Sequence, residues 1–205
     1  MATVPESVAP VSHLALVGLM GAGKTAVGRV LADRLRRQHV DLDLAVTQLA
    51  GRSIGVIFHE GGESTFRDLE AQSLVLQLAV GDPIVLSTGG GVLGRRENRA
   101  ILAADSTVVW LRARLETLAD RVGDGVGRPL LEGRNALGVL RDLAEDRHPA
   151  YERAADLVVD TDGLTVVEVV DAVLEALMDV GLIRPEALAG STVDGAGGRS
   201  CLRSR

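Results

Sequence analysis

Short apolar segments alternate with amphipathic segments along most of this chain. Five of the apolar segments have the length and composition of buried strands. The predicted strands are residues 13–17, 40–43, 83–87, 106–111 and 157–160. Strands that alternate with helices predict an α/β fold, in which helices cover both faces of a parallel sheet.

Between these strands, apolar residues recur at the spacing of helices with one buried face. The predicted helices are residues 24–37, 45–50, 53–58, 64–80, 95–104, 115–122, 135–154 and 165–180, with Ser53 and Ser64 as caps. Gly61 and Gly62 are expected to break the chain between two of them, and Pro149 to disrupt the helix over 135–154. One domain over residues 13–181 is therefore expected, between a flexible leader (1–12) and a disordered tail (182–205).

Composition and charge exclude several classes of protein. The chain has 205 residues, the size of one domain, and a net charge of −6 that argues against a nucleic-acid-binding surface. Its one cysteine, Cys201, lies in the polar tail, so neither a disulfide framework nor a cysteine metal site is expected. Because the sequence shows no membrane-length apolar run and no signal peptide, we expect a cytoplasmic protein without a membrane partner.

The segment Gly18-Leu-Met-Gly-Ala-Gly-Lys-Thr25 has the pattern of a phosphate-binding P-loop. It follows a predicted strand and opens a predicted helix, which is the context that this motif requires. Glycines let backbone N–H groups turn toward phosphate oxygens, and the helix adds its unpaired N-terminal donors. Lys24, the single lysine of the chain, would reach the terminal phosphates, and the Thr25 hydroxyl would ligate Mg²⁺.

Two acids follow the second predicted strand. Asp41 and Asp43 alternate at strand spacing, so as an extended pair they would share one face. One could help to hold Mg²⁺ through water, and the other could orient or deprotonate a substrate hydroxyl. The alternative is a pair of solvated acids before a helix, one of them an N-cap.

Three further features gain meaning only in combination. Arg67 is expected in the first turn of its helix, where a cation is unfavourable unless it faces an anionic ligand. Glu70, three residues later, could orient Arg67 through an ion pair. The alternative is that Arg67 and Glu70 form an ordinary ion pair on the surface. Gly89-Gly90-Gly91 predicts either a close backbone approach to a ligand or a tight turn. Arg121, Arg128 and Arg147 lie in or around a glycine-rich segment, as a phosphoryl-transfer lid requires.

Together these residues resemble the shikimate kinase family. The matching blocks are GLMGAGKT (18–25), DLD (41–43), GRSI (51–54), GESTFRDLE (62–70), STGGG (87–91), RPLL (128–131) and RxxxY (147–151). The resemblance covers residues 14–180, and its FRxxE, GGG and RPLL blocks are more specific than the P-loop. The chain departs from the family's common pattern at Arg36 (usually glycine), His39 (usually aromatic or apolar) and Thr47 (frequently an acid).

The resemblance implies a nucleoside-monophosphate-kinase type of fold, with three layers, a five-stranded parallel sheet and a mobile lid over about residues 121–134. It implies transfer of the γ-phosphoryl group of ATP, with Mg²⁺, to the 3-hydroxyl of shikimate in aromatic amino-acid biosynthesis. Asp43, Arg67, Gly90 and Arg147 would bind shikimate. Arg67 and Arg147 would hold its carboxylate, and Asp43 would hold its hydroxyls and could act as base.

On the nucleotide side, the resemblance implies phosphate contacts from the P-loop and from two arginines. The P-loop contacts would be Gly21, Ala22, Gly23, Lys24, Thr25 and Ala26. Arg121 would pack on the adenine, and Arg128 would be the lid arginine near the phosphates. Asp41 would lie on the magnesium side, bound through water. The catalytic groups would then be Lys24, Asp43 and Arg128, in a monomer whose partners are ATP and shikimate.

Two other functions remain open from sequence. A kinase for another small polyol acid, such as gluconate, would share the P-loop architecture, although FRDLE, GGG and RPLL argue against it. A nucleotide-binding regulator without catalysis would share the P-loop but would not need the intact set of acids and arginines.

Overall fold

The computed structural model describes residues 12–123 and 135–184. The predicted tail beyond residue 184, the leader before residue 12 and most of the predicted lid, Arg128 included, lie outside the described residues. Within the described part, no helix is long and apolar enough to cross a membrane.

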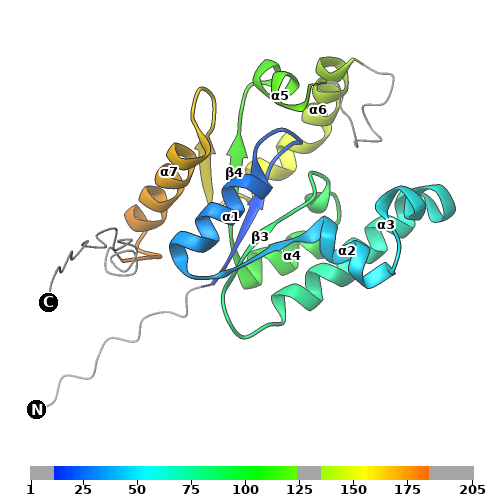
Figure 1. The fold of residues 1–205 in the computed structure, drawn as a ribbon, viewed down its shortest axis with the longest axis horizontal. Helices are drawn as coiled ribbons and strands as arrows, with labels where there is room; N and C mark the ends of the chain where they lie inside the picture. The colour runs from blue at the N-terminus through cyan, green and yellow to red at the C-terminus, as the bar shows by residue number, and fades with distance from the viewer. Residues whose placement is uncertain (1–11, 124–134, 185–205) are drawn as a thin grey trace, which may run out of the picture.

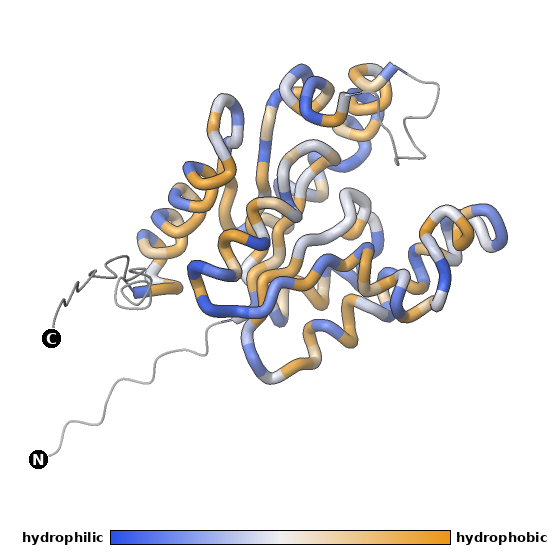
Figure 2. Tube along the Cα trace, viewed as in Figure 1, coloured by the Kyte–Doolittle hydropathy of each residue, from blue (hydrophilic) through white to orange (hydrophobic). Residues whose placement is uncertain are grey.

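A five-stranded parallel sheet in the order β2-β3-β1-β4-β5 forms the centre of the molecule (Figure 1). Its strands are β1 (His13–Val17), β2 (Gln38–Asp41), β3 (Ile84–Ser87), β4 (Ser106–Arg112) and β5 (Leu157–Asp160). The three middle strands are almost entirely buried, and Figure 2 shows them as a hydrophobic centre. Burial on both faces explains why their sequences are continuous apolar runs. The predicted α/β fold and five-stranded sheet are confirmed.

Seven α-helices and a short 3₁₀ turn, η1 (Val92–Gly94), connect these strands in the described residues. The helices are α1 (Lys24–Leu35), α2 (Leu42–Ala50), α3 (Ile54–Leu78), α4 (Arg96–Asp105), α5 (Leu115–Val122), α6 (Ala136–Ala154) and α7 (Val166–Asp179). Helices α1 and α7 pack together on one face of the sheet, and α4 packs on the other with α3 beside it (Figure 1). The predicted three-layer arrangement is therefore present.

The strand order opens a crevice between β1 and its neighbour β3. From β1 the chain passes through α1 to β2, whereas from β3 it passes through α4 to β4 on the other side of β1. Right-handed crossovers in opposite directions place α1 and α4 on opposite faces. The loops that follow β1 and β3 therefore separate at the carboxyl edge, which is where such sheets bind ligands.

A second, smaller core supports the arm made by α2 and the first part of α3. Val46, Ile57 and Phe66 are buried together there, apart from the main core around the sheet. Gly62, in the left-handed region at φ 69°, kinks α3 between the two predicted helices over 53–58 and 64–80. The predicted break at Gly61-Gly62 is thus a kink within the single helix α3. Ser53 caps the N-terminus of α3, as predicted, and its hydroxyl accepts a hydrogen bond from the Val56 N–H.

The predicted end of one helix and the predicted interruption of another were wrong. Helix α1 ends at Leu35, not Arg37, because Arg36 takes a left-handed conformation at φ 53° and closes the helix. Helix α6 runs through Pro149 without a break in its assignment. A proline removes one helical hydrogen bond, but Ala144 before it and Tyr151 after it are both buried in the same core, which holds the two halves in line.

Candidate functional site

A pocket of about 810 Å³ lies at the carboxyl edge of the sheet. It is lined by nearly all of the described residues that the sequence singles out. These are Gly21, Ala22, Gly23, Lys24, Thr25, Ala26, Asp41, Asp43, Arg67, Gly90, Arg121 and Arg147. Of the predicted site residues, Arg128 alone lies outside the described chain.

The P-loop wraps from the end of β1 to the start of α1. Gly21 lies at φ 84°, and a Cβ there would come within 2.8 Å of the Leu118 carbonyl oxygen, so both conformation and space call for glycine. Lys24 folds over the loop and donates from Nζ to the carbonyl oxygens of Gly18, at 2.8 Å, and Leu19, at 3.0 Å. The backbone N–H groups at the N-terminus of a helix and the ammonium group together suit a polyphosphate.

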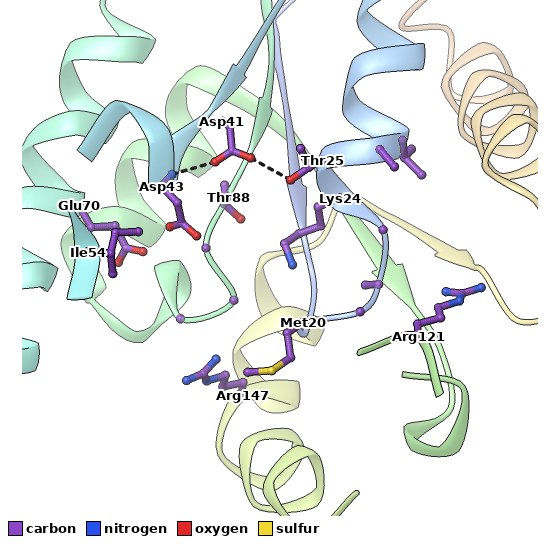
Figure 3. Close-up of a pocket in the computed structure, with 18 of the residues that line it drawn as sticks. Met20, Lys24, Thr25, Asp41, Asp43, Ile54, Glu70, Thr88, Arg121 and Arg147 are labelled. Atoms are coloured by element: carbon purple, nitrogen blue, oxygen red, sulfur yellow. Dashed lines mark hydrogen bonds between the residues drawn. The ribbon is translucent and has the colours of Figure 1, made fainter. Parts of the chain in front are cut away.

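The two acids lie on different elements, whereas both were predicted at the end of one strand. Asp41 ends β2 and caps α2, accepting from the N–H groups of Asp43 and Leu44. Asp43 already belongs to the first turn of α2, so the predicted extended pair on one face is wrong. The helix begins immediately after the strand, and its first turn brings Asp43 into the pocket beside Asp41 (Figure 3). The alternative of an N-cap was correct for Asp41.

Thr25 and Asp41 join the P-loop helix to the end of β2. The Thr25 hydroxyl donates to Asp41 Oδ2 at 2.8 Å (Figure 3). The described residues contain no cluster of three or more His, Cys, Asp or Glu side chains that could hold a metal ion. One hydroxyl beside one carboxylate instead suits Mg²⁺, which usually keeps several waters and binds one or two protein groups together with substrate phosphates.

Asp43 carries a carboxylate that is buried and incompletely satisfied. Its Oδ1 has no hydrogen-bond partner within the described part of the chain. Burial, and then the charge of Asp41, raise the pKa of Asp43 above the usual range, although Lys24 and Arg67 oppose that shift. A buried acceptor with a raised pKa is suited to take a hydrogen bond or a proton from a substrate hydroxyl.

Arg67 lies in the second turn after the Gly62 kink, not in the first turn of its helix as predicted. Its Nη1 donates to both carboxylate oxygens of Glu70, at 3.1 and 2.9 Å, and its Nη2 donates to Glu63 at 3.1 Å. Glu70 is fully buried, whereas Glu63 is largely exposed. The pair with Glu70 is therefore more than a surface contact, and it fixes the guanidinium at the wall of the pocket.

The three glycines after β3 are explained by close approach to side chains. A Cβ on Gly89 would lie 2.9 Å from Glu70 Oε1 and 3.0 Å from Asp43 Oδ1. A Cβ on Gly90 would lie 3.1 Å from Arg147 Nη1, and one on Gly91 would overlap the guanidinium of Arg67. Sequence left a close approach to a ligand and a tight turn open. The structure shows instead that the backbone of these three glycines lies very close to the predicted substrate-binding side chains Asp43, Arg67 and Arg147.

The arginines divide between the two ends of the pocket (Figure 3). Arg147, on α6, lies on the same side of the P-loop as Asp43. Arg121, on α5, lies on the other side, where its Nη1 and Nη2 donate to the hydroxyl and carbonyl oxygens of Thr161. Near this end, Leu164, which precedes α7, and Val166, the first residue of α7, line the pocket with apolar side chains.

Several lining residues were missed from the sequence. Ile54, Phe58 and Phe66 reach the pocket from α3, and Thr161 and Leu164 reach it after β5. The apolar residues of α3 have the spacing of a core face, which conceals their second role. Thr161 directly follows a predicted strand, so its position at the carboxyl edge was the signal that could have found it.

Comparisons with known proteins agree with this arrangement. A family model described as shikimate kinase matches residues 20–178. A shikimate kinase from Symbiobacterium thermophilum is 47% identical over 171 residues, which cover 82% of this chain and 98% of that relative. The structure is also similar to that of shikimate kinase from Acinetobacter baumannii in complex with shikimate, with a TM-score of 0.80 and 34% identity over 84% of this chain and 96% of that one.

A gluconokinase from Sinorhizobium meliloti 1021 shares the fold alone. Its TM-score is 0.57 at 17% identity, over 90% of this chain and 99% of that one. A common P-loop fold therefore does not distinguish the two kinases, whereas the sequence matches do. The chain belongs to the shikimate kinase family.

Proposed function

We propose that this pocket transfers the γ-phosphoryl group of ATP to the 3-hydroxyl of shikimate, giving shikimate 3-phosphate and ADP. The observation that carries the proposal is the meeting of two sets of residues in one pocket. Lys24 and Thr25 form the phosphate side, and Asp43, Arg67 and Arg147 form an acceptor side opposite them. A small acid with several hydroxyls needs arginines, a carboxylate and backbone donors, and that is the chemistry present.

In the proposed complex, Arg67 and Arg147 bind the carboxylate of shikimate, Gly90 offers backbone contact, and Asp43 holds the hydroxyl that reacts. That oxygen forms a bond to the γ-phosphorus as the bond from phosphorus to the bridging β–γ oxygen breaks. The hydroxyl proton passes to Asp43, whose raised pKa favours its uptake. Glu63, which is exposed, can release Arg67 to the substrate at little cost.

On the nucleotide side, Lys24 leaves the carbonyl oxygens of its own loop and meets the terminal phosphates, where its charge stabilises the transition state. Thr25 and, through water, Asp41 would hold Mg²⁺, which neutralises phosphate charge when bound. Arg121 would pack on the adenine, and the apolar side chains of Leu164 and Val166 line the same pocket. Arg128 is proposed as the lid arginine from sequence. We further propose a cytoplasmic monomer that binds neither nucleic acid nor membrane.

The test is ADP formation by the purified protein with ATP and Mg²⁺, in parallel reactions with shikimate, gluconate or no acceptor. We expect ADP release that depends on shikimate, with the product identified as the 3-phosphate by phosphorus and proton NMR. Turnover with gluconate alone would support the rival kinase. Tight ATP binding without turnover on either acid would support a nucleotide-binding regulator.

A further inference from the structure

Tyr151 lies one helical turn after Arg147 on α6 and links that helix to the glycine loop after β3. Its hydroxyl donates to the carbonyl oxygen of Gly90 at 2.5 Å. The side chain is 1% exposed and does not line the pocket. Any effect of Tyr151 on a substrate must therefore pass through its neighbours.

The guanidinium of Arg147, one turn earlier on the same helix, shares the space beside Gly90 with this hydroxyl. A phenol can donate once and accept as well, so a single hydroxyl can serve Gly90 and Arg147 together. The space around Gly90 agrees with this: a Cβ there would lie 3.1 Å from Arg147 Nη1 and 3.7 Å from the Tyr151 hydroxyl. Burial raises the pKa of Tyr151 well above its ordinary value, so the hydroxyl keeps its proton at any working pH.

The ring of Tyr151 is fixed by the sheet. Its centroid lies 5.5 Å from that of Trp110, a buried residue of β4, and 6.1 Å from that of His148. Aromatic contacts of this kind lock a side chain in one rotamer. The position of the hydroxyl is thus set by the sheet, next to the guanidinium of Arg147 at Gly90.

We propose that Tyr151 is a positioning residue for the acceptor substrate: anchored on Gly90, its hydroxyl holds Arg147 in the orientation that receives the substrate carboxylate. This inference rests on the proposed function, since it requires Arg147 to bind shikimate. Preorganisation of this kind lowers the cost of binding, because the guanidinium does not have to be ordered by the substrate.

The test is Tyr151→Phe, which removes the hydroxyl and keeps the ring against Trp110. We expect the KM for shikimate to rise about fivefold to tenfold, since a hydrogen bond to a charged group is lost. The KM for ATP should stay within twofold, and kcat should fall less than the KM rises. Unchanged emission from Trp110, the single tryptophan, would show that packing is retained. Equal changes in both KM values would show a general structural role and overturn the proposal.

An acceptor without the carboxylate gives a second, sharper arm. This acceptor is the shikimate analogue in which the carboxylate is reduced to a hydroxymethyl group. With it, kcat/KM of the wild type should exceed kcat/KM of Tyr151→Phe by less than about twofold, because the substrate then has no anion for Arg147 to bind. A ratio as large as that for shikimate would overturn the proposal.

Thr161→Val is the matched control, because it also removes a hydroxyl that contacts a pocket arginine, but on the nucleotide side. Its KM for shikimate should not change, and a rise equal to that of Tyr151→Phe would overturn the proposal. A wild-type protein with no shikimate-dependent turnover would instead disprove the proposed function. If the wild type turns over with shikimate and Tyr151→Phe has the same KM for shikimate, this inference alone is disproved.

Discussion

The hydroxyl of Thr25 donates to Asp41 Oδ2 at 2.8 Å, and this contact joins the first turn of the P-loop helix to the end of β2. Asp41 also caps α2 with its other oxygen. Asp41 thus has one structural role, capping α2, and one proposed role, at the Mg²⁺ site. These roles can be separated experimentally.

Asp41→Asn keeps an oxygen that can cap α2, places an amide group that can donate to the Thr25 hydroxyl, and removes the charge. Asparagine caps helices as well as aspartate does, so the melting temperature should hardly change. We expect the Mg²⁺ concentration for half-maximal activity to rise about tenfold, the effect of about 1.4 kcal/mol. Magnesium titrations of ADP formation at fixed ATP measure this. Thr25→Ser, which keeps the hydroxyl, is the control. If Asp41→Asn needs no more Mg²⁺ than the wild type, Asp41 only caps α2 and does not act at the Mg²⁺ site.

Arg67→Lys tests the acceptor side without leaving Glu70 as an unpaired buried charge. A lysine keeps the charge beside Glu70 but loses the planar fork that binds a carboxylate through two hydrogen bonds. The KM for shikimate should rise about tenfold or more, as expected when a charged hydrogen bond is lost, while the KM for ATP stays within twofold. Arg112→Lys, on an exposed pair with Asp160 outside the pocket, should change neither value. Parallel loss for ATP and shikimate would mean that Arg67 is structural.

Asp43→Asn should lose activity and gain stability. The raised pKa of Asp43 means that the folded chain binds its proton more tightly than the unfolded chain, so the wild type loses stability as pH rises through the ordinary carboxyl range toward the folded pKa. Above both values the full cost is present. At pH 7.5 the variant should therefore melt about 2–4 °C higher, which is what about 1 kcal/mol produces in a domain of this size.

The gain of Asp43→Asn should disappear below about pH 4, where the wild-type carboxyl is protonated in both states. Thermal melts across pH measure it, with the exposed Asp33→Asn as a control that should show no gain at any pH. A variant no more stable than wild type at pH 7.5 would contradict the assignment of a costly buried carboxylate.

Arg36→Gly should stabilise the fold without changing catalysis. Arg36 is the non-glycine residue with positive φ among those described, at 53°, and glycine takes this conformation without the steric cost that a side chain carries. The melting temperature should rise by about 2–4 °C. Arg37→Gly, one residue later, should lower it, because that side chain donates to the Ser12 carbonyl oxygen and its conformation needs no glycine. A lower melting temperature for Arg36→Gly would show that contacts of its side chain outweigh the backbone strain.

Local sequence determined the elements that depend on neighbouring residues. The P-loop from Gly18 to Thr25 was predictable because its glycines, lysine and threonine act within one strand–loop–helix unit. The parallel sheet was predictable because buried apolar runs alternated with amphipathic helices. Boundaries set by a single backbone conformation, such as the end of α1 at Arg36, were not predictable, because a left-handed arginine leaves no signal in the pattern.

Tertiary structure decided which residues meet. Sequence predicted that Asp43, Arg67 and Arg147 bind one substrate and that Glu70 could orient Arg67. It could not show that each of these four side chains contacts one member of Gly89-Gly90-Gly91. Nor did it assign a role to Tyr151, whose hydroxyl contacts a residue 61 positions away. The physical reason is that chain chemistry fixes periodicity and loop conformation within a few residues, whereas distances between side chains on different elements are set by the packing of helices on the sheet.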